Sequence, residues 1–279
     1  MIQEIASHKA FDGKVSYYKH ISKTCDTEMK FSVYEPPSIK SEKVPILFYL
    51  AGLTCTEETF MIKSGALNEA SKLGLLLVSP DTSPRNSING EETKDWDFGT
   101  GAGFYLDATE QPWDRNYKMF SYVTEELTKI VHENFNCNPE KQSIFGHSMG
   151  GHGALVCALK RPDLYKSVSC FAPISSPINS PWGKKAFSGY LGKNQTAWKE
   201  WDSSYLIEKN YNSFDEILID QGTNDEFLEE ELKPNIFFDK CMLVGQKLIM
   251  RYQDNYDHGY NFISTFINDH LSFHSQRLK

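Results

Sequence analysis

The chain has 279 residues, a length that fits either two average domains or one α/β domain. Its 40% hydrophobic and 24% charged residues are typical of a globular protein and exclude a disordered or collagen-like chain. With 29 lysines and arginines against 37 aspartates and glutamates, the formal net charge is −8, and no basic run offsets it, which argues against a nucleic-acid partner.

The beginning of the chain lacks the features of a secretory signal, because residues 1–18 contain neither an unbroken apolar stretch nor a small-residue cleavage site. No apolar run reaches the roughly 20 residues that a membrane span needs. The six cysteines show neither CxxC pairs nor the spacing of zinc ligands, so free thiols are expected. We therefore expect a soluble, cytoplasmic protein without metal, cofactor, membrane or nucleic-acid partner.

The sequence predicts half-exposed strands at the start of the chain and buried strands that alternate with helices after it. About residues 1–36 alternate polar and apolar positions, which is typical of two half-exposed antiparallel strands. Unbroken apolar runs then predict strands buried on both faces at 46–50, 75–78, 143–145, 168–171, 217–219 and 248–252. Helical spacing predicts helices at 67–73, 120–135, 151–160, around 235–245 and at 260–270. This alternation indicates an α/β fold, a mostly parallel central sheet flanked by helices in a single domain over 1–279.

Two long irregular segments, 80–118 and 172–194, interrupt this alternation. Loops of this length without structure are uncommon in compact domains and are usually functional. Both segments are rich in glycine, proline, tryptophan and tyrosine. They either build walls over a site at the carboxyl edge of the sheet or are surface excursions that contain short helices.

The strongest functional signal is a G-x-S-x-G motif at 146–150, between a short apolar strand and a small-residue helix. Gly146 and Gly150 permit a turn so tight that larger side chains would collide with the neighbouring strand and helix. Ser148 is thereby presented at the carboxyl edge of the sheet, where helix-terminal N–H groups favour developing negative charge. The motif in this context predicts a nucleophilic serine.

A serine hydroxyl is a weak nucleophile at neutral pH and needs a histidine base that is oriented by a carboxylate. In α/β-hydrolases the acid and then the histidine follow the serine, each in a loop after a later strand. The loops after the last two predicted strands supply Asp225 and His258 in this order. Asp220 is an alternative acid, but its place at the end of a strand favours a structural role, and Asp257 is adjacent to the base.

The other histidines near the motif or on predicted helices receive structural interpretations. His147 and His152 flank the serine turn and are expected to pack or hydrogen-bond locally. His132, His270 and His274 lie on helical segments and are expected at the surface.

An oxyanion hole should combine the backbone N–H of Met149, the residue after the serine, with one from the loop after the strand 46–50. In that loop Gly52 allows a turn that directs an N–H inward, and Leu53 is the expected donor. Cys55 in the same loop could itself be a nucleophile, but no histidine is paired with it, which favours a modulatory or structural thiol. The glycine-rich stretch 99–103 lacks the last glycine of a dinucleotide-binding loop, so no cofactor is expected.

Six segments carry a resemblance to a known family, in the order in which that family has them: 51–56, 103–109, 146–155, 181–192, 220–222 and 256–258. Together they closely resemble the S-formylglutathione hydrolases, also called esterase D, over nearly the whole chain. The resemblance implies an α/β-hydrolase fold, a Ser148–Asp225–His258 triad, and Leu53 and Met149 as oxyanion donors. It also implies hydrolysis of S-formylglutathione in formaldehyde detoxification, side activity on small carboxylic esters, and a cytosolic homodimer.

An acidic protein needs local cations to hold the two carboxylates of glutathione. The local cations are Lys63, Arg85, Lys184 and Lys185. Lys184 and Lys185 follow Trp182 in a loop that could overhang the site, with solvated surface lysines as the alternative. Trp96 and Trp182 are expected either to line the pocket or to anchor their loops. The reactive cysteine of the family corresponds to Cys55.

Two other functions are compatible with the same residues. One is a general carboxylesterase or an acyltransferase of the same fold, because a thiol leaves more readily than an alkoxide and one triad can serve both substrates. The other is a non-catalytic binding module, whose sign in the sequence would be a lost member of the triad. None is lost in this chain.

Overall fold

The structure is a computed structural model that describes residues 1–86, 90 and 92–279. Its central feature is a nine-stranded sheet with the order β1-β2-β3-β5-β4-β6-β7-β8-β9. The strands are β1 Gln3–Ala10, β2 Gly13–Ser22, β3 Thr27–Glu35, β4 Val44–Leu50, β5 Leu76–Pro80, β6 Cys137–His147, β7 Val168–Phe171, β8 Ile217–Gly222 and β9 Leu248–Gln253. Strands β4 to β9 pair in parallel, which confirms the predicted mostly parallel sheet.

The N-terminal segment forms three antiparallel strands rather than the two that we expected. The strand missed is β1, which is almost entirely exposed and therefore shows no buried alternate positions to reveal it. The remaining strands of this part, β2 and β3, bury alternate or continuous runs of side chains and extend the sheet through β5.

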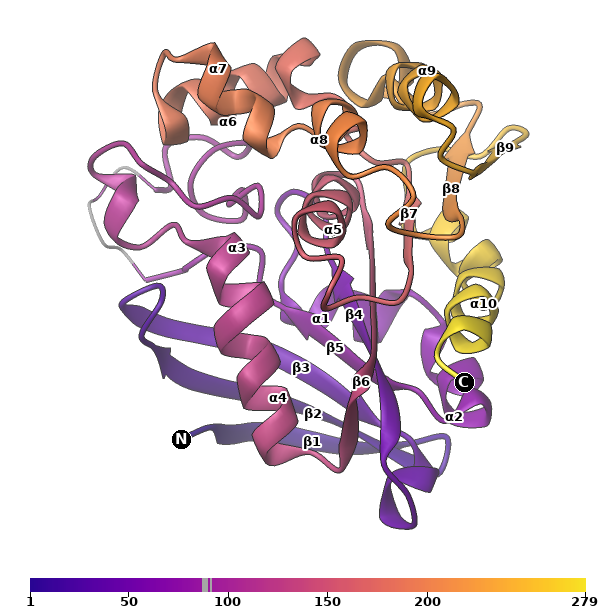
Figure 1. The fold of residues 1–279 in the computed structure, drawn as a ribbon. Coiled ribbons are helices and arrows are strands. Elements are labelled where there is room, and N and C mark those ends of the chain that lie inside the picture. The colour runs from indigo at the N-terminus through magenta and orange to yellow at the C-terminus, as the bar shows by residue number, and fades with distance from the viewer. Residues whose placement is uncertain (87–89, 91) are drawn as a thin grey trace.

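The helices pack on the sheet between its strands. In Figure 1, α4 and α5 lie in front of the sheet, whereas α10 packs beside α2. The helices are α1 Glu57–Lys63, α2 Ala66–Leu73, α3 Met119–Ser121, α4 Thr128–Asn134, α5 Met149–Lys160, α6 Pro181–Leu191, α7 Gln195–Trp198, α8 Ser203–Lys209, α9 Pro234–Val244 and α10 Tyr260–Arg277. A π-helical stretch, Tyr122–Leu127, joins α3 to α4, so the helix predicted at 120–135 is continuous in the chain.

The two long segments differ in content. Segment 172–194 contains α6, whose start is encoded by Ser180 and Pro181: the serine side chain accepts a hydrogen bond from the N–H of Gly183 at 3.0 Å. Segment 80–118 is mostly irregular and folds back over the loop after β4. Residues 87–89 and 91 of this segment lie outside the described residues.

The strand register brings the candidate residues to one edge. Leu50, Gly146, Cys170 and Ile219 stand side by side on β4, β6, β7 and β8. The loops that follow these parallel strands therefore meet at the carboxyl edge of the sheet, where ligand sites of such sheets are usually built.

A buried chain of hydrogen bonds joins α10 to the sheet. Its anchor is Asp220 on β8, whose carboxylate accepts hydrogen bonds from Arg251 at 2.6 and 2.5 Å and from His270 Nε2 at 3.3 Å. Although burial opposes ionisation, the hydrogen bonds from His270 and Arg251 hold the pKa of Asp220 below its usual value. An ionised carboxylate only accepts hydrogen bonds, so His270 carries its proton on Nε2 and accepts through Nδ1.

The same reasoning orients every further member of the chain. Ser169 donates to His270 Nδ1 and accepts from His274 Nε2, both at 2.8 Å, while Ser167 donates to His274 Nδ1 and accepts from Ser143, both at 2.7 Å. Burial lowers the pKa of both histidines, so both rings are neutral at pH 7. Every hydrogen bond of the chain therefore runs toward the carboxylate.

The expectation that His270 and His274 lie at the surface is wrong, because both are fully buried. They fall on the same helical stripe as the buried apolar residues Ile263, Ile267 and Leu271. This 3.6-residue spacing was a signal for burial in the sequence. It was overlooked because histidine is a polar residue.

Because all hydrogen bonds between Ser143 and Asp220 run in one direction, two serine-to-alanine substitutions should lower the free energy of unfolding by different amounts. Ser169→Ala leaves one nitrogen of each histidine unpaired in the core, so the free energy of unfolding should fall by about 2–4 kcal/mol. Ser143→Ala removes only the terminal donor and should cost about 1 kcal/mol or less. Urea unfolding of both variants measures the difference, and equal losses would contradict a directional chain.

Candidate active site

Ser148 occupies a sharp turn between β6 and α5. Its backbone has φ 58° and ψ −121°, a conformation that a residue with a side chain rarely adopts. The turn needs glycine on both sides: a Cβ on Gly150 would lie 1.9 Å from the carbonyl oxygen of Leu50, and a Cβ on Gly146 would lie 2.2 Å from that of Gly150. The turn places the serine at the carboxyl end of β6 and directly before the first turn of α5.

Asp225 and His258 form a hydrogen-bonded pair in the loops after β8 and β9. His258 Nδ1 lies 2.7 Å from Asp225 Oδ2. The buried carboxylate also accepts from the backbone N–H of Phe227 at 2.9 Å and from the side-chain amide of Gln221 at 3.1 Å. These donors fix the carboxylate, which in turn assigns the Nδ1–H tautomer to His258 and leaves Nε2 as a proton acceptor.

The two acidic candidates of the sequence thus have different partners. Asp220 is bound by Arg251 and His270 beneath α10, whereas Asp225 is bound by His258. Gln221 was not singled out from the sequence. Its signal was its place next to Asp220 on a strand, because neighbouring strand residues point to opposite faces of the sheet.

A cavity of about 150 Å³ opens beside the serine. It brings together residues from the loop after β4, the serine turn, α6 and the loops after β8 and β9. Its lining consists of Gly52, Leu53, Cys55, Trp96, His147, Ser148, Trp182, Phe227, His258 and Tyr260. Most of these side chains are aromatic or aliphatic, so the cavity suits a small group of low polarity.

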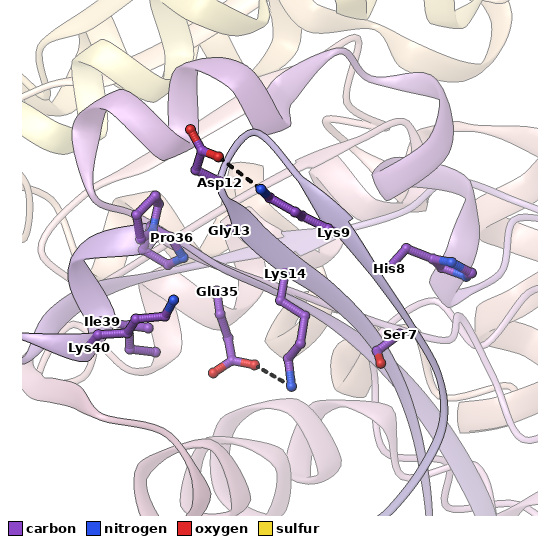
Figure 2. A pocket seen from close by; sticks show the side chains of 11 residues that line it. Ser7, His8, Lys9, Asp12, Gly13, Lys14, Glu35, Pro36, Ile39 and Lys40 are labelled. Carbon is purple, nitrogen blue, oxygen red and sulfur yellow. Dashed lines mark ion pairs between the residues drawn. The ribbon is translucent and has the colours of Figure 1, made fainter.

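A larger groove of about 680 Å³ lies at the turn between β1 and β2 (Figure 2). Two lysines of its lining pair with carboxylates, Lys9 with Asp12 at 3.2 Å and Lys14 with Glu35 at 3.1 Å. The described lining of this groove includes none of the predicted triad. The smaller cavity is therefore the candidate active site.

The loop after β4 approaches the serine closely. A Cβ on Gly52 would lie 3.2 Å from the Cβ of Ser148, so a side chain at this position would crowd the serine. Leu53 follows in the cavity wall, and Met149 begins α5, where the first N–H groups of a helix have no helical acceptor. The two predicted oxyanion donors thus flank the serine.

Segment 80–118 holds this loop in place. The carbonyl oxygen of Cys55 accepts hydrogen bonds from Thr82 Oγ1 and Arg85 Nη2, both at 2.6 Å. The Tyr105 hydroxyl donates to the carbonyl oxygen of Ala51 at 2.9 Å. The long segment therefore buttresses the loop after β4 as well as contributing to the cavity wall.

The predicted substrate-binding residues divide into two groups. Trp96 and Trp182 line the cavity with their rings perpendicular and 5.7 Å apart, Trp182 being buried and Trp96 58% exposed at the rim. Lys185 forms ion pairs with Asp97 at 2.5 Å and Asp95 at 3.3 Å, so its charge is already compensated.

Lys184 is exposed on α6 and does not belong to the described cavity lining. Cys55 is half-buried in the cavity wall. Burial raises the pKa of its thiol, which keeps Cys55 protonated at neutral pH and argues against a nucleophilic role.

Three further features concern the described chain as a whole. All six cysteines lie within the described part of the chain and are free thiols. Within residues 1–86, 90 and 92–279, no three histidine, cysteine, aspartate or glutamate side chains are arranged to hold a metal ion. No helix in the same ranges is long and apolar enough to cross a membrane.

Comparison with known proteins places this geometry in a family. The family model Esterase, described as "Putative esterase", matches residues 22–273. The S-formylglutathione hydrolase of Rattus norvegicus is 50% identical over 279 residues, which cover 99% of each chain. That of Arabidopsis thaliana is 52% identical over 280 residues, which cover 100% of this chain and 98% of the plant protein.

The solved structure of an S-formylglutathione hydrolase from Agrobacterium tumefaciens superimposes with a TM-score of 0.96. The two sequences are 46% identical, and the alignment covers 99% of both chains. These similarities confirm the α/β-hydrolase fold and the resemblance seen in the sequence. The chain is a member of the S-formylglutathione hydrolase family of serine esterases.

Proposed function

We propose that this chain is a serine thioesterase that hydrolyses S-formylglutathione to formate and glutathione through a formyl-serine intermediate. The supporting observation is that His258, which is hydrogen-bonded to Asp225, lines the same small cavity as the strained Ser148, in a chain half identical to named S-formylglutathione hydrolases. We assign Ser148 as the nucleophile, His258 as the base and Asp225 as the acid that orients it. The N–H groups of Leu53 and Met149 form the oxyanion hole.

The first half of the reaction forms the acyl-enzyme. His258 Nε2 accepts the proton of Ser148 as Oγ attacks the formyl carbon, and the N–H groups of Leu53 and Met149 hold the resulting oxyanion. Collapse of this intermediate breaks the carbon–sulfur bond, and glutathione leaves as a thiol with the proton from His258. A thiol with a pKa of about 8.5 needs less help to leave than an alkoxide does.

The second half releases formate. Water takes the place of glutathione, His258 accepts one of its protons, and the hydroxide oxygen attacks the formyl carbon of the acyl-serine. The second tetrahedral intermediate uses the same oxyanion donors. Its collapse returns the proton to Ser148 and frees the site for another turnover.

The size of the cavity supports a small acyl group. Trp182 and Phe227, whose ring centroids lie 4.8 Å apart, form part of a wall around only about 150 Å³. A formyl group is the smallest acyl group and fits without displacing either ring. Small carboxylic esters are the expected side substrates for the same reason.

The glutathione part of the substrate would extend along the rim of the cavity. We assign Cys55, Trp96 and Trp182 to contacts there, with Lys184 as the cation that attracts a glutathione carboxylate. Lys185 contributes indirectly, because its ion pairs with Asp95 and Asp97 tie the segment that carries Trp96 to α6.

Kinetics with two substrates test the assignment. The kcat/KM for S-formylglutathione should be well above that for a simple acetyl ester, and Ser148→Ala should lower the turnover of both by about 10⁶-fold. Ser264→Ala, an exposed serine on α10, serves as the control and should keep full activity. Near-equal kcat/KM values for the two substrates would favour a general carboxylesterase.

The role of Lys184 predicts a selective change in KM. Lys184→Ala should raise the KM for S-formylglutathione about threefold to fivefold without changing kcat, because an exposed charge pair contributes about 1 kcal/mol or less. The effect should shrink at high salt and be absent for an uncharged acetyl ester. Lys193→Ala, an exposed lysine just after α6, should change nothing. An unchanged KM in the Lys184 variant would remove this residue from the binding site.

We further propose that the chain acts in formaldehyde detoxification in the cytoplasm, as a homodimer joined at β9. The two edges of the sheet support this choice of surface. Edge strand β1 has a bulge between Glu4 and Ala6 and carries charged residues, which protect an edge from pairing. The edge at β9 instead adjoins exposed apolar side chains of β9 and α9: Phe238, Met242, Leu243, Ile249 and Tyr252.

If this surface joins the two copies, a charged substitution within it should separate the dimer into monomers. Leu243→Glu, at a side chain that is 74% exposed, should halve the mass measured by light scattering while activity is retained, because the cavity is formed within one chain. Ile21→Glu, at a side chain that is 73% exposed at the opposite end of the sheet, should leave the dimer intact. A wild-type monomer would exclude the homodimer.

A further inference from the structure

His147 is a buried histidine in the candidate active site, and it has no role in the proposed triad mechanism. It is the last residue of β6 and directly precedes Ser148. Its ring lines the cavity, and its centroid lies 4.5 Å from that of His258, with 44° between the two rings. Phe227 packs edge-on against His258 at 5.1 Å, so His147 is one of two rings that enclose the base.

The ring lies close to two elements of the site, the turn after β4 and the loop that carries His258. Nδ1 points to the turn after β4, because a Cβ on Gly52 would lie only 3.3 Å from it. The backbone of His258 is close enough to influence protonation of the same ring. Yet neither nitrogen has a hydrogen-bond partner among the residues that the structure describes.

Two buried polar atoms without partners destabilise a fold, and such atoms in a native structure call for an explanation. A leucine at this position would fill similar space without that cost. The imidazole is therefore retained for a property that an aliphatic side chain lacks. The property available here is a neutral, polar aromatic ring in contact with a histidine that becomes charged during the reaction.

We propose that His147 is a positioning residue that packs against His258 and stabilises the imidazolium form when His258 accepts the serine proton. This inference rests on the proposed function and deepens it. A cation in contact with the face of an aromatic ring is attracted to it, and a neutral imidazole adds a dipole that an aliphatic side chain lacks. The same ring fixes the distance between the Gly52 turn and His258. The oxyanion donors and the proton acceptor are thereby placed around the same carbonyl group of the substrate.

The ring performs this task only while it is uncharged, and its surroundings ensure that it is. Burial, reinforced by neighbouring His258, lowers the pKa of His147 well below its usual value. Among the described residues, Asp225, which pairs with His258, and the side chains of Tyr260 and Cys55 are further titratable groups around the cavity, with Lys63 over the Tyr260 ring and Arg85 on the Cys55 carbonyl. Burial raises the pKa of both Tyr260 and Cys55, so neither carries a charge at neutral pH.

Replacing the ring should change the pH profile rather than the binding of substrate. In His147→Leu, the lower apparent pKa of kcat/KM, which reports the base in the free enzyme, should fall by about half a unit. We expect kcat to fall about tenfold, KM to stay within twofold, and the midpoint of thermal unfolding to be the same or higher. His147→Gln, which restores a neutral polar group beside His258, should recover part of both losses.

His152→Leu is the matched control. His152 is also a buried histidine in the first turns after β6, but it packs beside Phe104 and Phe187 and is absent from the described cavity lining. Its replacement should leave the pH profile unchanged, whatever it does to stability. A shift of the profile equal to that of His147→Leu would show a general effect of disturbing α5 and would overturn the proposal.

Other outcomes are equally decisive. An unchanged pH profile in His147→Leu, or a tenfold loss of kcat without any shift in either variant, would reduce His147 to a space-filling residue. Labelling of the wild type with a serine-reactive fluorophosphonate, followed by mass spectrometry, separates this failure from failure of the proposed function. Label on Ser148 supports the triad on which the inference rests, whereas an unlabelled serine would overturn both.

Discussion

The site depends on one steric constraint, the close passage of the serine turn beneath the end of β4. The Cα of Gly150 comes so near the carbonyl oxygen of Leu50 that no side chain fits between them, and Ser148 is held in a strained backbone conformation as a result. That strain is maintained by β4 and β7, the almost entirely buried strands on either side of β6. The catalytic geometry is thus a product of core packing, which leaves the serine no alternative position.

The proposed base, His258, is held in place by contacts on another side of the site. His258 lies in a loop between β9 and α10, and α10 is bound to the sheet by a hydrogen-bond chain that ends on Asp220. Neighbouring residues of β8 therefore serve opposite faces: Asp220 fixes α10, and Gln221 fixes the Asp225 carboxylate. Asp220 and Asp225 are both buried carboxylates, and their burial is tolerated because each accepts several hydrogen bonds.

The positive charges of two cations near the cavity are already paired with carboxylates. The chain carries a net charge of −8, and Arg85 and Lys185, two cations near the site, are consumed by Asp81 and by Asp95 and Asp97. These pairs tie surrounding segments together. Lys184, which the described ion pairs do not include, is the cation that we propose for a glutathione carboxylate.

The sequence by itself determined the parallel sheet, the serine turn and the order of acid and histidine, because glycine spacing and strand–loop order are local properties of the chain. The hydrogen bond between His270 and Asp220, the pairing of Lys185 with Asp97 and the contact between His147 and His258 are visible only in the tertiary structure. These facts depend on residues far apart in the sequence, whose meeting is set by strand register and helix packing. A periodic pattern can show that a side chain faces inward, but it cannot show which partner it meets there.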